Sequence, residues 1–187
     1  MKQYVTLLLL LLFVATTTAG QKQQSSREKE IPNFHQVNPN LYRGGQPKKD
    51  GLQQLKQLGV TTIINLRDSD EQAGAEEKVA KSIGLRYFNV PLSNFNRPSD
   101  TNVDEILKLI EAQENQPVFV HCKRGSDRTG LIIAIYRMTH DGWNSERAKA
   151  EAKEFGLGFW QVKMKDYLSD YERRLQQGNV GSRAAKP

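Results

Sequence analysis

The sequence has only one cysteine, Cys122, and no long apolar run after its first twenty residues. An internal disulfide is therefore excluded. Lysine and arginine exceed aspartate and glutamate by only 27 to 21, a net charge of +6. The basic residues are scattered and lack the interleaved aromatic side chains of a nucleic-acid groove. We therefore expect no nucleic-acid partner, and the length fits one domain that acts as a monomer.

Residues 1–20 have the order of a cleavable secretory signal: a charge at Lys2, an apolar run over 4–15, and small polar residues. The run is shorter than the roughly 20 residues that span a bilayer. We therefore predict export to the periplasm or the extracellular space, cleavage near Ala19 or Gly20, and no stable membrane span afterwards.

The rest of the chain alternates between strand-like and helix-like segments. A polar leader at 21–33 and a polar tail at 176–187 are predicted to be disordered, and the domain is predicted over 34–175. Strands are predicted over 60–66, 85–90 and 117–121, and helices over 48–58, 71–83, 100–114, 129–140, 144–155 and 160–175. This order predicts an α/β fold with a mainly parallel sheet flanked by helices and a helical C-terminal part.

Several helix ends carry their own signals. Gly59 and Gly84 are predicted to be left-handed stops, and Asp100 is predicted to be a helix cap. The inner face of the helix that follows is predicted to be formed by Val103, Ile106, Leu107 and Ile110.

The third predicted strand runs directly into His121 and Cys122, and a helix follows after about seven residues. Such a segment can curl so that its N–H groups point inward and form an anion site at the helix N-terminus. Gly125 allows a close approach or a positive φ, and Arg128 offers a fork of donors to two phosphate oxygens. The same positive field favours a thiolate at Cys122, a nucleophile aimed at a bound phosphorus atom. The alternative for a single cysteine is a buried apolar residue.

His-Cys, five residues, then Arg-Thr-Gly resembles the signature of the protein tyrosine and dual-specificity phosphatase superfamily. The matching residues are His121, Cys122, Gly125, Arg128, Thr129 and Gly130. Residues 40–47 and 61–67 are also similar to those of compact bacterial and fungal dual-specificity-type phosphatases. The resemblance implies a phosphotyrosine phosphatase-like fold and a phosphocysteine intermediate, with no metal or other cofactor.

The resemblance also implies roles for individual residues. Cys122 would be the nucleophile, Arg128 would stabilise the transferred phosphate, and His121 would orient the loop from beneath. The phosphate would be bound by Lys123, Arg124, Gly125, Ser126, Thr129 and Gly130. Thr129 is predicted to donate its hydroxyl to the leaving sulfur, to cap the helix, or both. Arg43 and Arg67 would either frame the site or pin strand ends.

The general acid is the point at which the chain departs from the superfamily. Many members carry an aspartate about thirty residues before the cysteine, whereas the corresponding stretch 89–95 contains no acid. The candidates are Asp127, similar to the loop acid of a bacterial subgroup, and Asp100. Asp127 is the favoured prediction, and its alternative is a carboxylate that pairs with a neighbouring Lys or Arg.

The substrate stays open at the level of sequence. A phosphorylated protein, a phosphorylated small molecule or a phosphorylated lipid all fit a basic loop. Lys123 and Arg124 would favour a crowded anion, such as a phosphoinositide or an inositol polyphosphate, unless both point to solvent. A sulfurtransferase is disfavoured by Arg-Thr-Gly and an arsenate reductase by the lack of a second cysteine. A non-catalytic phosphate-binding module is the remaining alternative.

Overall fold

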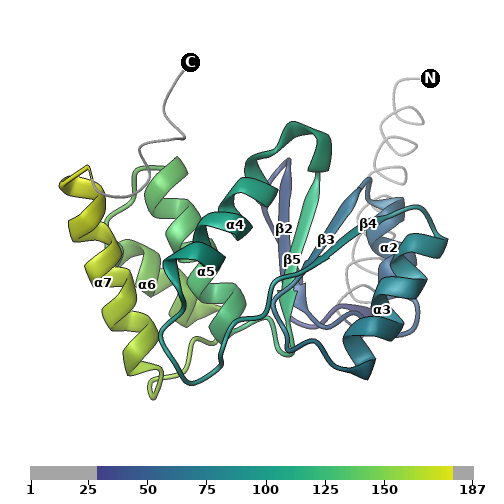
Figure 1. Ribbon diagram of the computed structural model, residues 1–187, viewed down its shortest axis with the longest axis horizontal. Helices are drawn as coiled ribbons and strands as arrows, with labels where there is room; N and C mark the ends of the chain where they lie inside the picture. Colours follow the sequence, from purple (N-terminus) through teal and green to yellow (C-terminus); the bar gives the residue numbers. More distant parts are fainter. Residues whose placement is uncertain (1–28, 179–187) are drawn as a thin grey trace, which may run out of the picture.

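Five strands form the central sheet of the computed structural model, which describes residues 29–178 (Figure 1). They are β1 (His35–Asn38), β2 (Leu41–Gly45), β3 (Thr62–Asn65), β4 (Arg86–Asn89) and β5 (Val118–Cys122), in the order β1-β2-β5-β3-β4. β2, β5, β3 and β4 are parallel, and β1 pairs antiparallel with β2 at one edge. The predicted α/β fold with a mainly parallel sheet is confirmed.

Helices cover both faces of this sheet. They are α2 (Gly51–Gln57), α3 (Glu71–Ser82), α4 (Asp100–Glu111), α5 (Asp127–His140), α6 (Ser145–Glu154) and α7 (Val162–Gln176), with a 3-10 turn η1 (Gln113–Asn115). α2 and α3 lie on one side of the sheet and α4 to α7 on the other (Figure 1). No helix within residues 29–178 is long and apolar enough to cross a membrane.

The neighbouring strands β5 and β3 are mostly apolar, because helices cover both faces of the sheet there. Successive side chains of a strand point to opposite faces. Accordingly, Val118 and Val120 of β5 lie in the core under α4 to α7, whereas Phe119 lies in the smaller core under α2 and α3. Full burial of such a side chain stabilises the fold by about 1.5–3 kcal/mol, so the end of β5 is a firmly anchored point of the chain.

The two predicted glycine stops and the predicted inner face of α4 are confirmed, but the predicted cap of α4 is not. Gly59 and Gly84 have φ values of 87° and 81°, as expected for left-handed stops. The inner face of α4 is buried as predicted. Its cap, however, is Ser99, whose side chain accepts a hydrogen bond from the N–H of Asn102, and Asp100 is the first helical residue. The prediction of Asp100 as the cap is therefore wrong by one residue.

Other boundaries also differ from the predictions. β1 and β2 were not anticipated, because the glycines and polar residues of 35–45 weaken the strand pattern. α5 begins at Asp127 rather than at 129, so Thr129 lies inside the first turn and is not the cap. α2 begins three residues later than predicted, and η1 replaces the last turn predicted for α4.

The predicted leader is only partly correct. Ile31 is fully buried, and the carbonyl of Glu30 accepts a hydrogen bond from the N–H of Lys48 at 2.8 Å. The folded unit therefore begins before residue 34. The predicted signal at 1–20, the leader up to residue 28 and the tail from residue 179 lie outside the described residues.

Candidate active site

The predicted phosphate loop connects the last residue of β5, Cys122, to the first residue of α5, Asp127. Gly45 of β2 lies beside Cys122 in the parallel register. The loop thus sits at the carboxyl end of a central strand and at the N-terminus of a 14-residue helix. That position is where open α/β sheets bind ligands, and the N–H groups of the first helical turn favour an anion there.

The tight curl of the loop depends on Gly125. Its φ is 73°, and a Cβ built on it would lie 2.4 Å from the carbonyl carbon of Gly44 and 2.6 Å from the N atom of Gly45. No L-residue with a side chain fits this position without a shift of the backbone. The predicted need for glycine is confirmed.

Two side chains hold the Gly125 carbonyl. Arg43 donates to it from Nη2 at 2.8 Å, and Asn33 donates from Nδ2 at 3.0 Å. These two hydrogen bonds fix the orientation of the Gly125 peptide, as a curled anion-binding loop requires. Asn33 was missed from the sequence because it was assigned to the leader.

Arg43 is 1 % exposed and its guanidinium lies 4.2 Å from the ring centre of Phe155. Burial lowers its pKa to about 10, against the opposing charges of Glu151 and Cys122, so it remains a cation at neutral pH. Arg43 does not line the pocket over the loop. Of the two predicted roles, the geometry supports the one in which it pins the backbone.

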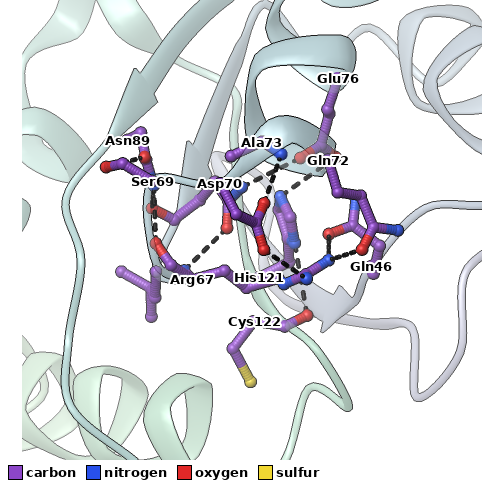
Figure 2. A network of polar contacts seen from close by, with 12 residues as sticks. Gln46, Arg67, Ser69, Asp70, Gln72, Ala73, Glu76, Asn89, His121 and Cys122 are labelled. Atoms are coloured by element: carbon purple, nitrogen blue, oxygen red, sulfur yellow. Dashed lines mark hydrogen bonds and ion pairs between the residues drawn. The ribbon is translucent and has the colours of Figure 1, made fainter.

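His121 lies directly beneath the loop and is fully buried. Its Nε2 is 3.3 Å from Oε1 of Glu76, an ion-pair distance without the alignment of a hydrogen bond, and its Nδ1 is 3.4 Å from the carbonyl O of Cys122. Figure 2 shows His121 between this network and Cys122, whose sulfur is directed away from it. The predicted orienting position of His121 is supported by these contacts.

Glu76 comes from the buried face of α3 and was missed from the sequence. Its Oε2 accepts hydrogen bonds from Asn65 at 3.1 Å and from Tyr87 at 3.0 Å. Burial opposes its ionisation, but the electrostatic interaction with His121 and the hydrogen bonds from Gln46 and Tyr87 hold the pKa of Glu76 below its ordinary value. Ala73 and Ala80 lie on the same face of α3 as Glu76, and their spacing was the one feature of the sequence that indicated a buried position for it.

Arg67 lies at the edge of the polar network that contains Glu76 and His121. Its guanidinium donates to Gln46 at 2.6 Å, to Gln72 at 2.7 Å and to Asp70 at 3.2 Å (Figure 2). It does not line the pocket, so the geometry favours its role in fixing the loop after β3.

A pocket of about 290 Å³ opens above the loop. It is lined by Asp68, Asn94, Cys122, Lys123, Arg124, Asp127 and Arg128. Cys122 is 3 % exposed, but it borders this pocket and is not sealed in the apolar core. The alternative of a purely structural cysteine is therefore disfavoured.

Arg128 lines the pocket from the first turn of α5. Its Nη1 donates to the carbonyl oxygens of Leu66 and Leu92, each at 3.4 Å. These contacts hold the guanidinium at the carboxyl ends of β3 and β4. Its buried Nε has no hydrogen-bond partner among the described residues. A buried donor of this kind needs an acceptor, and an anion in the pocket would supply one.

The structure brings Asp127 to the pocket and leaves Asp100 outside it. Asp127 is 2 % exposed, and its carboxylate accepts from Arg124 and from the N–H of Gly158, both at 2.9 Å. Asp100 binds Arg174 and Tyr167 at 2.6 Å each, and the hydrogen bond from Arg174 lowers its pKa. Asp100 therefore fastens α4 to α7.

Three other predicted phosphate-binding residues do not line the pocket through their side chains. Ser126 occupies the cap position of α5 without a side-chain cap bond. The hydroxyl of Thr129 lies 3.5 Å from the carbonyl O of Gly44, and Gly130 packs against Ala152. Ser126 can contribute only its backbone, whereas the N–H of Gly130 already donates to the carbonyl of Ser126 at 2.6 Å. The role of Thr129 at the sulfur stays a prediction.

A strand that ends in a cysteine, a curled anion loop and a helix that presents an arginine define the class of cysteine-dependent phosphatases. The chain belongs to the DSP-PTPase phosphatase family, because a family model described as "DSP-PTPase phosphatase fused to NAD+ Kinase" matches residues 16–170.

Individual relatives agree with this assignment. The chain is 30% identical over 127 residues to the dual specificity protein phosphatase TpbA of Pseudomonas aeruginosa strain UCBPP-PA14, covering 67% of this chain and 56% of TpbA. It thus spans little more than half the length of that relative. It is 26% identical over 144 residues to the inositol diphosphatase DSP3 of Arabidopsis thaliana, covering 75% of this chain and 70% of DSP3.

Solved structures share the fold. The crystal structure of a P. aeruginosa TpbA variant in complex with pTyr superposes with a TM-score of 0.65 at 27% identity, covering 79% of this chain and 91% of that one. The core catalytic domain of the PP-IP phosphatase SIW14 from S. cerevisiae gives a TM-score of 0.68 at 20% identity, with 81% and 94% covered.

Proposed function

We propose that this protein hydrolyses phosphate monoesters of the phosphotyrosine type through a phosphocysteine intermediate. The observation that carries the proposal is the shared pocket of Cys122 and Arg128, in which a nucleophile and a buried, unsatisfied guanidinium donor face the same space. The pTyr complex of TpbA, a relative with the same fold, supports the choice of substrate type.

The reaction has two displacements. The Cys122 thiolate attacks phosphorus, a sulfur–phosphorus bond forms, and the ester bond breaks as an acid protonates the leaving oxygen. Water then attacks phosphorus, gives a proton back to that acid, and releases phosphate and the thiolate. Arg128 and the loop N–H groups stabilise the equatorial oxygens in both steps.

The test is metal-independent hydrolysis of p-nitrophenyl phosphate in the presence of EDTA. We expect activity for the wild type and a loss of at least about 1,000-fold for Cys122→Ser, as expected for removal of a nucleophile. Activity in both proteins would exclude the cysteine mechanism. Phosphate binding without activity in either protein would favour a non-catalytic phosphate-binding module.

An inositol polyphosphate or a phosphoinositide is the second candidate substrate. It is favoured by the exposed basic residues Lys123 and Arg124 at the pocket and by relatives named inositol diphosphatases. A panel of phosphotyrosine peptides and inositol phosphates, assayed on the same preparation, would rank the two classes by kcat/KM.

Export through the N-terminal segment is part of the same proposal. Its support is the order of charge, apolar run and small residues over 1–20. N-terminal sequencing of the mature protein should begin near Gly20 or Gln21. A full-length product that remains in the cytosol would contradict export.

A further inference from the structure

The proposed reaction needs an acid for the leaving oxygen, and two carboxylates line the pocket with Cys122. One is Asp127 and the other is Asp68, in the loop between β3 and α3. A general acid must reach the leaving oxygen and needs a carboxyl oxygen that is not already held by protein donors. The two carboxylates differ in these contacts.

Asp127 has both of its oxygens engaged as acceptors. Oδ2 pairs with the guanidinium of Arg124, and Oδ1 accepts from the N–H of Gly158. Both carboxylate oxygens are therefore already taken up by protein donors. The contact with Gly158 also ties the first turn of α5 to the segment between α6 and α7. Asp127 is thus well suited to holding the loop and poorly suited to donating a proton.

Asp68 is free of such constraints. It is exposed, and its carboxylate makes no hydrogen bond or ion pair with any residue from 29 to 178. It follows Leu66 by two positions, and the carbonyl of Leu66 lies 3.4 Å from Nη1 of Arg128. The exposed Asp68 therefore lines the same pocket as the arginine that would hold the phosphate.

The backbone that carries Asp68 is firmly held although its side chain is free. Asn89 of β4 donates to the carbonyls of Asn65 and Arg67 at 3.0 and 2.8 Å. Ser69 donates to Oδ1 of Asn89 at 2.7 Å, so both neighbours of Asp68 are anchored to the same side chain (Figure 2). A free carboxyl on a fixed backbone is what positioned proton transfer requires.

We propose that Asp68 is the general acid of the first displacement and the base of the second. The proposal rests on the proposed function. In the first step the Asp68 carboxyl gives its proton to the ester oxygen as the phosphorus–oxygen bond breaks. In the second step the carboxylate accepts a proton from the attacking water as the sulfur–phosphorus bond breaks, which restores both groups.

The experiment compares Asp68→Asn, Asp127→Asn and Asp70→Asn with the wild type and Cys122→Ser. Asp70→Asn is the matched control, because it removes the same charge from the same loop while asparagine keeps the ability to cap α3. Each protein is assayed on p-nitrophenyl phosphate, which has a good leaving group, and on phenyl phosphate, which has a poor one. A pH–rate profile and a thermal unfolding curve are recorded for each.

For Asp68→Asn we expect a loss of about 100-fold or more on phenyl phosphate and of less than about 10-fold on p-nitrophenyl phosphate, the range typical of general acid catalysis. The alkaline fall of the pH–rate profile should disappear. Asp70→Asn should stay within about twofold of the wild type on both substrates.

Other outcomes separate the two proposals. If the wild type is active and Cys122→Ser is not, equal losses on both substrates for Asp68→Asn would overturn only the role of Asp68. A leaving-group-dependent loss for Asp127→Asn, with Asp68→Asn unaffected, would assign the acid to Asp127 as the sequence predicted. A wild type inactive on both substrates would remove the proposed function and, with it, the role of Asp68.

Discussion

The phosphate loop separates two polar regions that are built in opposite ways. The floor, which we define as Arg43, Glu76 and His121, is at most 7 % exposed and its charged groups contact other protein groups. The mouth, which consists of Asp68, Asn94, Lys123 and Arg124, is exposed or half-buried and lines the pocket. A buried charge is costly to leave unpaired, whereas an exposed charge is solvated by water. The floor should therefore govern stability and loop shape together, and the mouth should govern activity alone.

The largest effect on stability is expected for Glu76→Gln, which removes the buried carboxylate that contacts His121 and accepts hydrogen bonds from Asn65 and Tyr87. We expect the free energy of unfolding to fall by about 3 kcal/mol, as is typical when one partner of a buried pair is removed. Glu77→Gln is the matched control, since its ion pair with Lys81 is exposed and a change within about 0.5 kcal/mol is expected there. Urea unfolding of the wild type, Glu76→Gln and Glu77→Gln measures both changes in the free energy of unfolding.

The same pair predicts a dependence on pH. The pKa of Glu76 is lowered in the folded state, so its ionised form contributes its full stabilisation above the ordinary value of 4.5. This contribution is lost as the pH falls from that value through the lowered pKa of the folded state. The difference in stability between the wild type and Glu76→Gln should therefore shrink on acidification below about pH 4.5. A difference that stayed constant would show that the charge of Glu76 does not contribute to the stability of the fold.

The floor also shows what could not be predicted from the sequence. The strands 60–66 and 117–121 and most helices were predictable because their apolar periodicity is strong. Glu76 was not, because a glutamate in a helix points to solvent in most proteins, and only the tertiary pairing with His121 explains its burial. Asn33 was missed for a related reason: a short polar segment gives no periodic signal, although Ile31 beside it anchors the segment in the core.

The loop itself was predictable because its chemistry is local. Cys122, Gly125 and Arg128 lie within seven consecutive positions, and the backbone geometry that joins them needs no distant residue to be inferred. The acid was harder, because Asp68 reaches the pocket only through the parallel pairing of β3 with β5. Spacing along the chain carries no information about that contact.

An intermediate effect is expected for Gly125→Ala, which tests how far activity depends on the shape of the loop above the floor. A left-handed conformation costs an L-residue about 1–2 kcal/mol, and the new Cβ would also meet the backbone of Gly44. We expect a loss of about 2 kcal/mol in unfolding free energy and a loss of activity larger than about 10-fold, since the N–H groups would move away from the phosphate.

The control for this variant is Gly142→Ala. Gly142 has a similar φ of 68°, but nothing lies within 4 Å of its added Cβ. It should therefore lose about 1 kcal/mol of stability from backbone strain and keep its activity. Equal activity in the two variants would mean that activity does not depend on the tight curl of the loop.

The smallest effect is expected at the mouth, for Lys123→Ala. An exposed lysine contributes little to stability, so the free energy of unfolding should change by less than about 0.5 kcal/mol. Its charge can still attract substrate, and about 1 kcal/mol of attraction corresponds to a rise in KM of about fivefold, with kcat unchanged. Because exposed charges are screened by salt, the rise should fade as ionic strength increases. The rise in KM should also be larger for an inositol polyphosphate than for a phosphotyrosine peptide, since more negative charge lies near the side chain.

The control for this variant is Lys81→Ala, on the exposed end of α3, which removes the same net charge. An equal rise in KM there would show that Lys123 acts only through the overall charge of the protein.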